Sequence, residues 1–173
     1  MSGKKNNSLP DNFSEFIKAL NANNVEYLVI GGFAMGAYGY IRSTGDLDIF
    51  INATTDNAKR AIKACTDFGI DKEDVTEEMF LIPKMVGIGQ PPLRIEILKK
   101  LDVVDFNLAY KRAEKKHIDD QIIPVVSLDD LILLKQAAVK DRSKERDIED
   151  LNYLKKLKAT LKGPNNKKRW KFW

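Results

Sequence analysis

Residues 31–51 read GGFAMGAYGYIRSTGDLDIFI, and much of the fold follows from this segment. Its glycine pair, Gly31-Gly32, directly follows the apolar run VEYLVI, which is typical of a short buried strand. A glycine turn between a strand and a helix lets the backbone approach a ligand closely, and the helix N-terminus offers free N–H groups to phosphate oxygens. The sequence therefore predicts a strand, a glycine turn, a short helix and a second strand, at residues 25–30, 31–32, 33–40 and 46–51.

Two aspartates, Asp46 and Asp48, alternate with apolar residues on the second of these strands. Side chains alternate between the two faces of a strand, so both carboxylates lie on one face, where their charges repel unless a cation lies between them. A later strand at 93–98 carries Glu96, which faces away from the apolar side of that strand. If the two strands pair, three carboxylates converge at one end of the sheet.

Such a set of carboxylates predicts a particular metal chemistry. Three hard oxygen ligands without a nearby histidine or cysteine suit Mg²⁺ or Mn²⁺ rather than zinc. Two such ions, about 3.5–4 Å apart, are the usual arrangement for nucleotidyl transfer. The glycine turn would hold the β- and γ-phosphates of a nucleoside triphosphate (NTP), while Arg42 and Thr44 would add a cation and a hydroxyl to the same anion. The alternative for Arg42 and Thr44 is that they only fix the loop.

The order of these residues resembles that of the nucleotidyltransferase superfamily with the DNA polymerase β-type fold. The likeness is strongest to small prokaryotic members, which include antibiotic and toxin–antitoxin nucleotidyltransferases, and it covers about residues 13–105. It rests on Gly31-Gly32, Arg42-x-Thr44-x-Asp46-Leu47-Asp48 and Arg94-Ile95-Glu96. The resemblance implies that Asp46 and Asp48 are metal ligands, and that Glu96 is the third ligand or the base for the acceptor hydroxyl. It also implies that the glycine pair touches the triphosphate.

Two positions carry alternative interpretations. Lys135 and the run KERDIEDL at 144–151 resemble a C-terminal helical segment of the same small proteins, so Lys135 is a candidate nucleotide or acceptor contact. The helical pattern itself places Lys135 on the solvated side of an amphipathic helix. Arg94 shares a face with Glu96, which predicts an ion pair between the two.

The remaining patterns complete an α/β (α+β) fold, in which a small mixed sheet is flanked by helices and followed by C-terminal helices. Pro124 predicts that the strand at 121–126 lies at an edge, because proline cannot donate to the ladder. Further helices are predicted at 13–20, 55–68, 103–114, 127–139 and 144–161, with a short strand at 85–88. The expected organisation is a nucleotidyltransferase core at 1–126, a helical segment packed on it at 127–162, and a basic aromatic tail at 163–173.

Composition excludes several other classes of protein. Of the 173 residues, 43% are hydrophobic and 31% charged, which is typical of a globular domain. One cysteine, Cys65, excludes an internal disulfide, and one histidine, His117, leaves almost nothing for a zinc site or a histidine-based triad. The net charge of +4 comes from the tail, which holds four of the 29 basic residues and none of the 25 acidic ones. No apolar run is long enough to span a membrane and no signal sequence is recognisable, so we expect a cytoplasmic protein.

Three hypotheses about function follow. The first is an enzyme that uses two Mg²⁺ or Mn²⁺ ions to transfer a nucleoside monophosphate from NTP to a hydroxyl, or to a phosphate, on a small molecule, RNA or protein. The second is a weak or inactive relative that acts as a toxin–antitoxin or regulatory binding partner. The third is a nucleic-acid-binding module that depends on the basic tail. The region 79–88 is a candidate surface for a homodimer.

Overall fold

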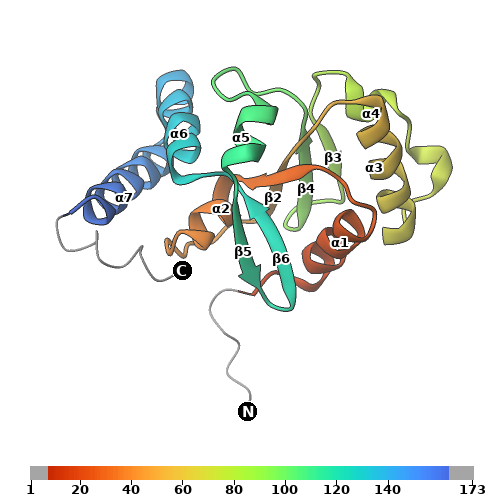
Figure 1. The fold of residues 1–173 in the computed structure, drawn as a ribbon, viewed down its shortest axis with the longest axis horizontal. Helices are drawn as coiled ribbons and strands as arrows, with labels where there is room; N and C mark the ends of the chain where they lie inside the picture. The colour runs from red at the N-terminus through yellow and green to blue at the C-terminus, as the bar shows by residue number, and fades with distance from the viewer. Residues whose placement is uncertain (1–7, 164–173) are drawn as a thin grey trace, which may run out of the picture. The chain divides into compact units, whose positions relative to one another are not determined.

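The computed structural model describes residues 8–163, which contain a six-stranded mixed sheet flanked by helices (Figure 1). The strand order is β3-β4-β2-β1-β6-β5. The strands are β1 (Tyr27–Ile30), β2 (Asp46–Ile51), β3 (Val86–Ile88), β4 (Arg94–Leu98), β5 (Glu114–Ile118) and β6 (Gln121–Val125). The helices are α1 (Asp11–Ala22), α2 (Gly31–Ala37), α3 (Thr55–Phe68), α4 (Glu78–Leu81), α5 (Phe106–Arg112), α6 (Leu128–Arg142) and α7 (Glu145–Leu161), with a 3-10 turn η1 (Lys72–Asp74).

The register of the central strands determines which side chains meet. Strands β1 and β2 are antiparallel, with Ile30 opposite Asp48. Strand β2 pairs in parallel with β4, so that Asp46 is opposite Arg94 and Asp48 is opposite Glu96. Because register partners point to the same side, the carboxylates of β2 and β4 share one face of the sheet and the apolar residues between them share the other.

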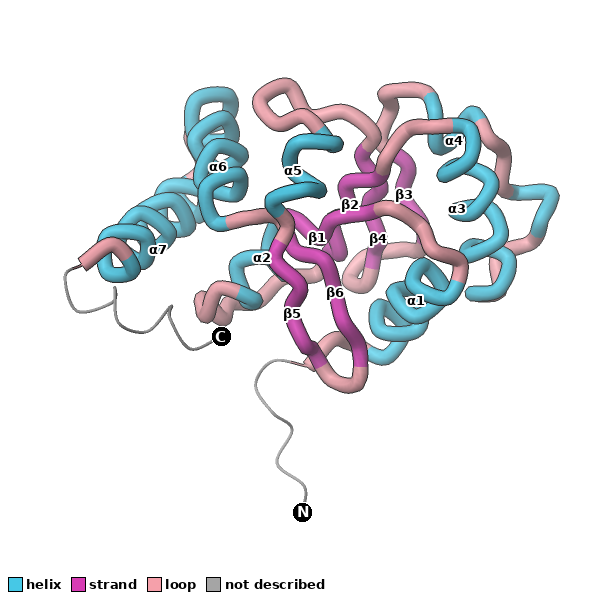
Figure 2. Tube along the Cα trace, viewed as in Figure 1, coloured by secondary structure: helices cyan, strands magenta, loops and turns pink. Residues whose placement is uncertain are grey.

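The face opposite the carboxylates is buried and packs against α1. The Tyr27 hydroxyl of β1 donates a hydrogen bond to Asn21 of α1 at 2.9 Å. Helix α3 lies beside α1 (Figure 2), where Phe16 and Phe68 pack edge to face with ring centroids 5.1 Å apart. The buried aliphatic side chains of this face are Val29, Leu47, Ile49, Ile95, Ile97, Ile123 and Val125. Each contributes about 1.5–3 kcal/mol by leaving water.

The carboxylate-bearing face is covered further along the strands by α5. Phe50, two residues after Asp48, packs edge to face on Phe106 at the start of α5, with centroids 5.1 Å apart. Asp105 caps this helix by accepting a hydrogen bond from the backbone three residues on, at 3.0 Å. Asp46 and Asp48 are half-buried, whereas Phe50 is fully buried. The face therefore runs from an accessible polar end into the apolar core.

Two expectations about the β5–β6 region are wrong. Pro124 does not mark an edge strand, because β6 lies between β1 and β5. The pairing of β6 with β1 is limited to Val29 opposite Val125, so the N–H that Pro124 lacks interrupts little of that ladder. The helix expected over 103–114 is shorter than that, and Glu114–Ile118 form the edge strand β5. Its charged sequence, EKKHI, lacks the apolar alternation that predicts a strand.

The other predicted helices and strands are present, with ends that differ by a few residues. Helix α2 begins at Gly31 instead of Phe33, so the glycine pair forms the first turn of the helix. The region 71–92 contains η1, α4 and the expected short strand β3, which is the other edge of the sheet. The homodimer surface proposed for 79–88 stays a prediction.

Helices α6 and α7 form a compact unit of their own, which begins at Leu128. Within residues 8–163, none of the helices is both long enough and apolar enough to cross a membrane. The predicted basic aromatic tail lies, from residue 164 onward, outside the described residues.

Candidate active site

Three carboxylates and one guanidinium share the accessible end of the sheet face. Asp46, Asp48, Arg94 and Glu96 are each half-buried. The two strands that carry the acids do pair, and their parallel register places Asp48 beside Glu96 and Asp46 beside Arg94. Strand pairing thus brings acids that lie about fifty residues apart in the chain onto adjacent positions.

The glycine turn packs directly against this set. Gly31 has a φ of 68°, in the left-handed region that disfavours side chains. A Cβ atom at Gly31 would collide with the Asp48 carboxylate. The turn therefore needs glycine for two reasons, its backbone conformation and the close approach of Asp48.

The second glycine accommodates Thr44. A Cβ atom at Gly32 would come within 2.5 Å of the Thr44 hydroxyl oxygen. That hydroxyl also donates a long hydrogen bond of 3.5 Å to the Asp46 carbonyl oxygen. Arg42 is half-buried in the same loop, and its Nη1 donates to the Ser43 carbonyl oxygen at 3.3 Å. The loop before β2 is thus folded against the glycine turn, with Thr44 as the contact.

Arg94 and Glu96 form the ion pair that the sequence predicts. Arg94 Nε lies 3.6 Å from Glu96 Oε1, and both side chains are about two-thirds covered. On its other side, the Arg94 guanidinium donates to the Met85 sulfur at 3.9 Å and lies over Gly87 of β3, where a Cβ atom would collide with it. Gly87 is a site residue that the sequence analysis did not single out. A glycine inside a short strand is the signal for such a close approach.

The donor atoms of this site suit divalent cations. All three acids offer hard oxygen ligands, which Mg²⁺ and Mn²⁺ prefer. Strand register brings them to one face, and the glycine turn leaves room for the Asp48 carboxylate. As the side chains stand, no group of three or more histidine, cysteine, aspartate or glutamate residues within 8–163 is arranged to hold a metal ion. The backbone positions fit a cation site, and the side chains would have to regroup to form one.

A cavity of about 280 Å³ lies behind the glycine turn. Gly32 and Thr44 line it, together with Leu47 and Val29 from the face opposite the carboxylates. The rest of its lining comes from residues 8–10 just before α1, from α2, from the 41–44 loop and from the β5–β6 hairpin. The glycine turn thus separates the acidic site from a largely apolar pocket, which the sequence did not predict.

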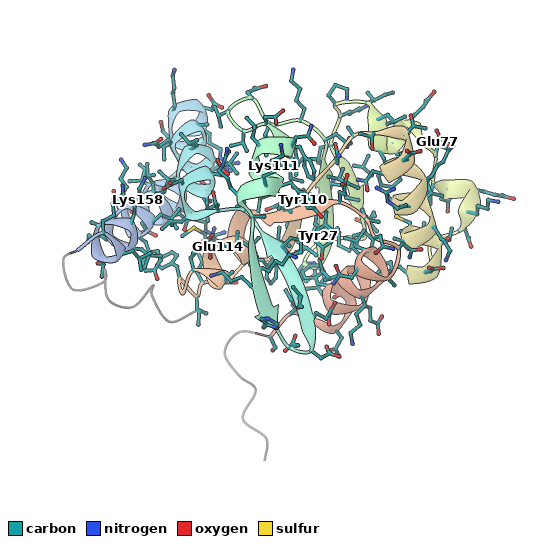
Figure 3. The ribbon with its side chains drawn as sticks, in the orientation of Figure 1. Tyr27, Glu77, Tyr110, Lys111, Glu114 and Lys158 are labelled. Carbon is teal, nitrogen blue, oxygen red and sulfur yellow. The ribbon has the colours of Figure 1, made fainter. Side chains whose placement is uncertain are left out.

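A second, more polar cavity of about 250 Å³ lies near the start of β1 and holds none of the predicted site residues. Tyr27 of β1 and Tyr110 of α5 line it (Figure 3). Burial raises the pKa of both tyrosine hydroxyls, so both are neutral hydrogen-bonding groups at ordinary pH.

Lys135 lies within the α6–α7 unit and is buried, so the expectation that it faces solvent is wrong. Its Nζ lies 2.7 Å from Asp150 Oδ2 and 3.2 Å from Asp147 Oδ1. Arg142 joins the cluster with Nε 2.9 Å from Asp147 Oδ2. Burial raises the pKa of Asp147, but hydrogen bonds from Arg142 and Lys135 outweigh this effect and hold it below its ordinary value of 3.8. A nucleotide contact by Lys135 stays a prediction.

Comparison with known protein families assigns the chain. The model described as nucleotidyl transferase AbiEii toxin, type IV toxin–antitoxin system, matches residues 19–168. The chain belongs to the AbiEii nucleotidyltransferase family. The resemblance stated from the sequence is therefore confirmed.

Solved structures agree on the fold. The chain resembles the lincomycin-bound crystal structure of the lincosamide antibiotic adenylyltransferase LnuA, with a TM-score of 0.53 and 16% sequence identity. The match covers 87% of this chain and 98% of that one. At this identity the likeness concerns the fold, and it confirms the predicted nucleotidyltransferase architecture. No curated protein gives a significant match.

Proposed function

We infer that this AbiEii-family protein transfers a nucleoside monophosphate from an NTP to a hydroxyl group, or to a phosphate, in a reaction that depends on two Mg²⁺ or Mn²⁺ ions. The observation that carries the proposal is the parallel register of β2 and β4, which sets Glu96 beside Asp48 on the face that also carries Asp46. Three acids on adjacent positions repel one another, and divalent cations relieve that repulsion.

Each acid has a proposed role. Asp46 and Asp48 are the side chains that would hold the cations, and Glu96 would complete the set or accept the proton of the acceptor hydroxyl. When bound, the cations would neutralise the triphosphate and favour ionisation of that hydroxyl. The acceptor oxygen forms a bond to the α-phosphorus while the bond from the α-phosphorus to the bridging oxygen breaks. Pyrophosphate leaves with the electron pair.

The triphosphate would be held beside the acids by the residues around the glycine turn. Gly31 and Gly32 present backbone at the start of α2, and Thr44 packs on Gly32 from the loop that also carries Arg42. A guanidinium and a hydroxyl suit phosphate oxygens. The contact between Thr44 and Gly32 supports a joint role, because any ligand of the turn also meets the loop.

The acceptor is proposed only as a class, namely a hydroxyl group, or a phosphate, on a small molecule, RNA or protein. LnuA is a lincosamide antibiotic adenylyltransferase, which makes ATP the first nucleotide to test. The toxin–antitoxin family makes cellular RNA and protein the first acceptors to test. It also suggests a partner antitoxin.

The test is label transfer from each α-³²P-labelled NTP into the small-molecule, RNA and protein fractions of a cell extract. We expect the wild type to label one fraction with one NTP. Asp48→Asn should lower the rate about 1,000-fold or more, because several kcal/mol of charge stabilisation are lost and each 1.4 kcal/mol is worth about tenfold. Asp102→Asn, an exposed acid after β4, is the matched control and should retain activity.

Two outcomes would contradict the proposal. Equal labelling by the wild type and Asp48→Asn would show that the acids are not the active site. No labelling with any NTP, together with no Mg²⁺-dependent NTP binding in calorimetry, would favour the alternative of an inactive toxin–antitoxin or regulatory binding partner.

A further inference from the structure

We propose that Arg94 is a positioning residue that holds Glu96 until divalent cations bind, so that Arg94 sets the cation concentration at which the acidic site assembles. The inference rests on the proposed function, because it assumes that the three acids are cation ligands. It adds a residue and a control step that neither the family assignment nor the fold comparison supplies.

The first observation is the position of Glu96 between two neighbours. In the sheet, β4 lies between β3 and β2. Glu96 is therefore opposite Gly87 on one side and opposite Asp48 on the other. Its carboxylate can be drawn to either side, and the Arg94 guanidinium lies on the Gly87 side.

The second observation is that Arg94 occupies the Gly87 side. Its guanidinium lies against Gly87 at the place where a Cβ atom would be, and its Nη2 contacts the Met85 sulfur at 3.9 Å. The guanidinium thus occupies the space that a side chain at Gly87 would fill. In this position, Arg94 Nε lies 3.6 Å from Glu96 Oε1.

The third observation is that this ion pair is loose. At 3.6 Å the contact is longer than the 2.7–3.2 Å typical of N–H···O hydrogen bonds. Arg94 Nε is enclosed and has no hydrogen-bond partner among the described residues. A partly exposed pair of this kind is worth only a little free energy, so a divalent cation can replace Arg94 as the partner of Glu96.

The presence or absence of a divalent cation then decides whether Glu96 pairs with Arg94 or turns toward Asp48. Without a divalent cation, Arg94 holds Glu96, and the acids within residues 8–163 do not form a three-ligand group. A divalent cation held by Asp46 and Asp48 would attract Glu96, which can then leave Arg94. Arg94 stays beside Asp46, its register partner on β2. Arg94 and the cation therefore compete for one carboxylate.

The test is Mn²⁺ binding to the full chain, measured from the electron paramagnetic resonance signal of free Mn²⁺. We expect Arg94→Gln to bind Mn²⁺ about two- to fivefold more tightly, as the loss of a partly exposed ion pair predicts. Gly87→Ala keeps every charge but fills the space that the Arg94 guanidinium occupies, so it should also tighten Mn²⁺ binding. Lys84→Gln removes an exposed positive charge just before β3 and should bind Mn²⁺ as the wild type does.

Unchanged or weaker Mn²⁺ binding by both Arg94→Gln and Gly87→Ala overturns the inference, as does equal tightening by Lys84→Gln, which would be a general charge effect. Asp48→Asn in the same titration separates this failure from that of the proposed function. If Asp48→Asn loses Mn²⁺ but Arg94→Gln binds it unchanged, only the role of Arg94 is wrong. If Asp48→Asn binds Mn²⁺ like the wild type, the cation site itself is wrong.

Discussion

Asp48 on β2 and Glu96 on β4 are register partners in a pair of parallel strands, and both side chains point to the same face of the sheet. Their Cα atoms are held at the strand spacing of about 4.8 Å, which no loop movement can change. The acids of the site are therefore positioned by the pairing of two strands inside the sheet. Asp48 is contacted by the glycine turn, and Glu96 is paired with Arg94 of β4, whose guanidinium lies against Gly87 of β3.

Replacing Gly31 by alanine should damage the site as well as the fold. The left-handed φ of 68° should cost a side chain about 1–2 kcal/mol, and the new Cβ should displace the Asp48 carboxylate. Gly69→Ala is the matched control, because Gly69 also has a positive φ but no atom within 4 Å of its Cβ position. Urea unfolding should show a similar loss of stability in both variants, whereas only Gly31→Ala should lose Mn²⁺ binding. Normal Mn²⁺ binding by Gly31→Ala would show that this contact does not matter.

Removing the charge of Lys135 should destabilise the α6–α7 unit strongly. Lys135→Met removes the cation that the enclosed carboxylates of Asp147 and Asp150 share, while Arg142 still pairs with Asp147, and this loss should cost about 3 kcal/mol. Hydrogen exchange of the α6 and α7 amides reports this loss directly. Adding Asp150→Asn to Lys135→Met should restore part of the protection, since one of the two buried negative charges is then removed. Unchanged exchange in Lys135→Met would indicate that the lysine is kept for ligand binding and not for stability.

The same cluster predicts a pH dependence. The pKa of Asp147 is held below 3.8 in the folded state, so its ionised form stabilises the fold above that pH, and this contribution is lost as the pH falls through the lower, folded-state value. The stability difference between the wild type and Asp147→Asn should be constant from pH 7 to about pH 5 and should shrink below pH 4. Circular dichroism during urea unfolding at each pH measures it. A difference that grows on acidification would reverse the assigned sign.

The rate at which a thiol reagent modifies Cys65 should report unfolding, because the buried thiol is unreactive in the native protein. Burial in α3 raises the pKa of its thiol to about 12, and the thiolate is the reactive form. It is the single cysteine of the chain. At pH 8 a thiol reagent should therefore modify the native protein at the rate of global or local opening, and the rate should rise steeply with urea. Immediate modification of the native protein would show that α3 is less protected than its packing implies.

Local patterns predicted the strands and turns that carry the acids, because those patterns repeat within a few residues. The alternation of Asp46 and Asp48 with apolar neighbours indicates a strand whose one face is polar. The pairing of that strand with the one that carries Glu96 joins segments far apart in the sequence, and only the family resemblance predicted it. Gly87 inside the short strand β3 is a local signal of a close approach, but only the pairing of β3 with β4 shows that Arg94 makes it.

The errors have a common physical cause, which is that burial and pairing depend on distant partners. Lys135 was assigned to a solvated helix face, yet it is buried because Asp147 and Asp150 follow on the next helix and pair with it. Pro124 was assigned to an edge strand, yet the highly charged segment Glu114–Ile118 adds a further strand outside it. Neither partner is visible in the residues next to Lys135 or Pro124.

The most direct test of the acidic site is a crystal structure of the protein with Mn²⁺ and a non-hydrolysable NTP, with Mn²⁺ located by anomalous scattering. The account predicts Mn²⁺ between the Asp46 and Asp48 carboxylates, the triphosphate beside the Gly31-Gly32 turn, and Glu96 moved from Arg94 toward the metal. Mn²⁺ and triphosphate bound away from Asp46 and Asp48, with Glu96 still paired to Arg94, would contradict it.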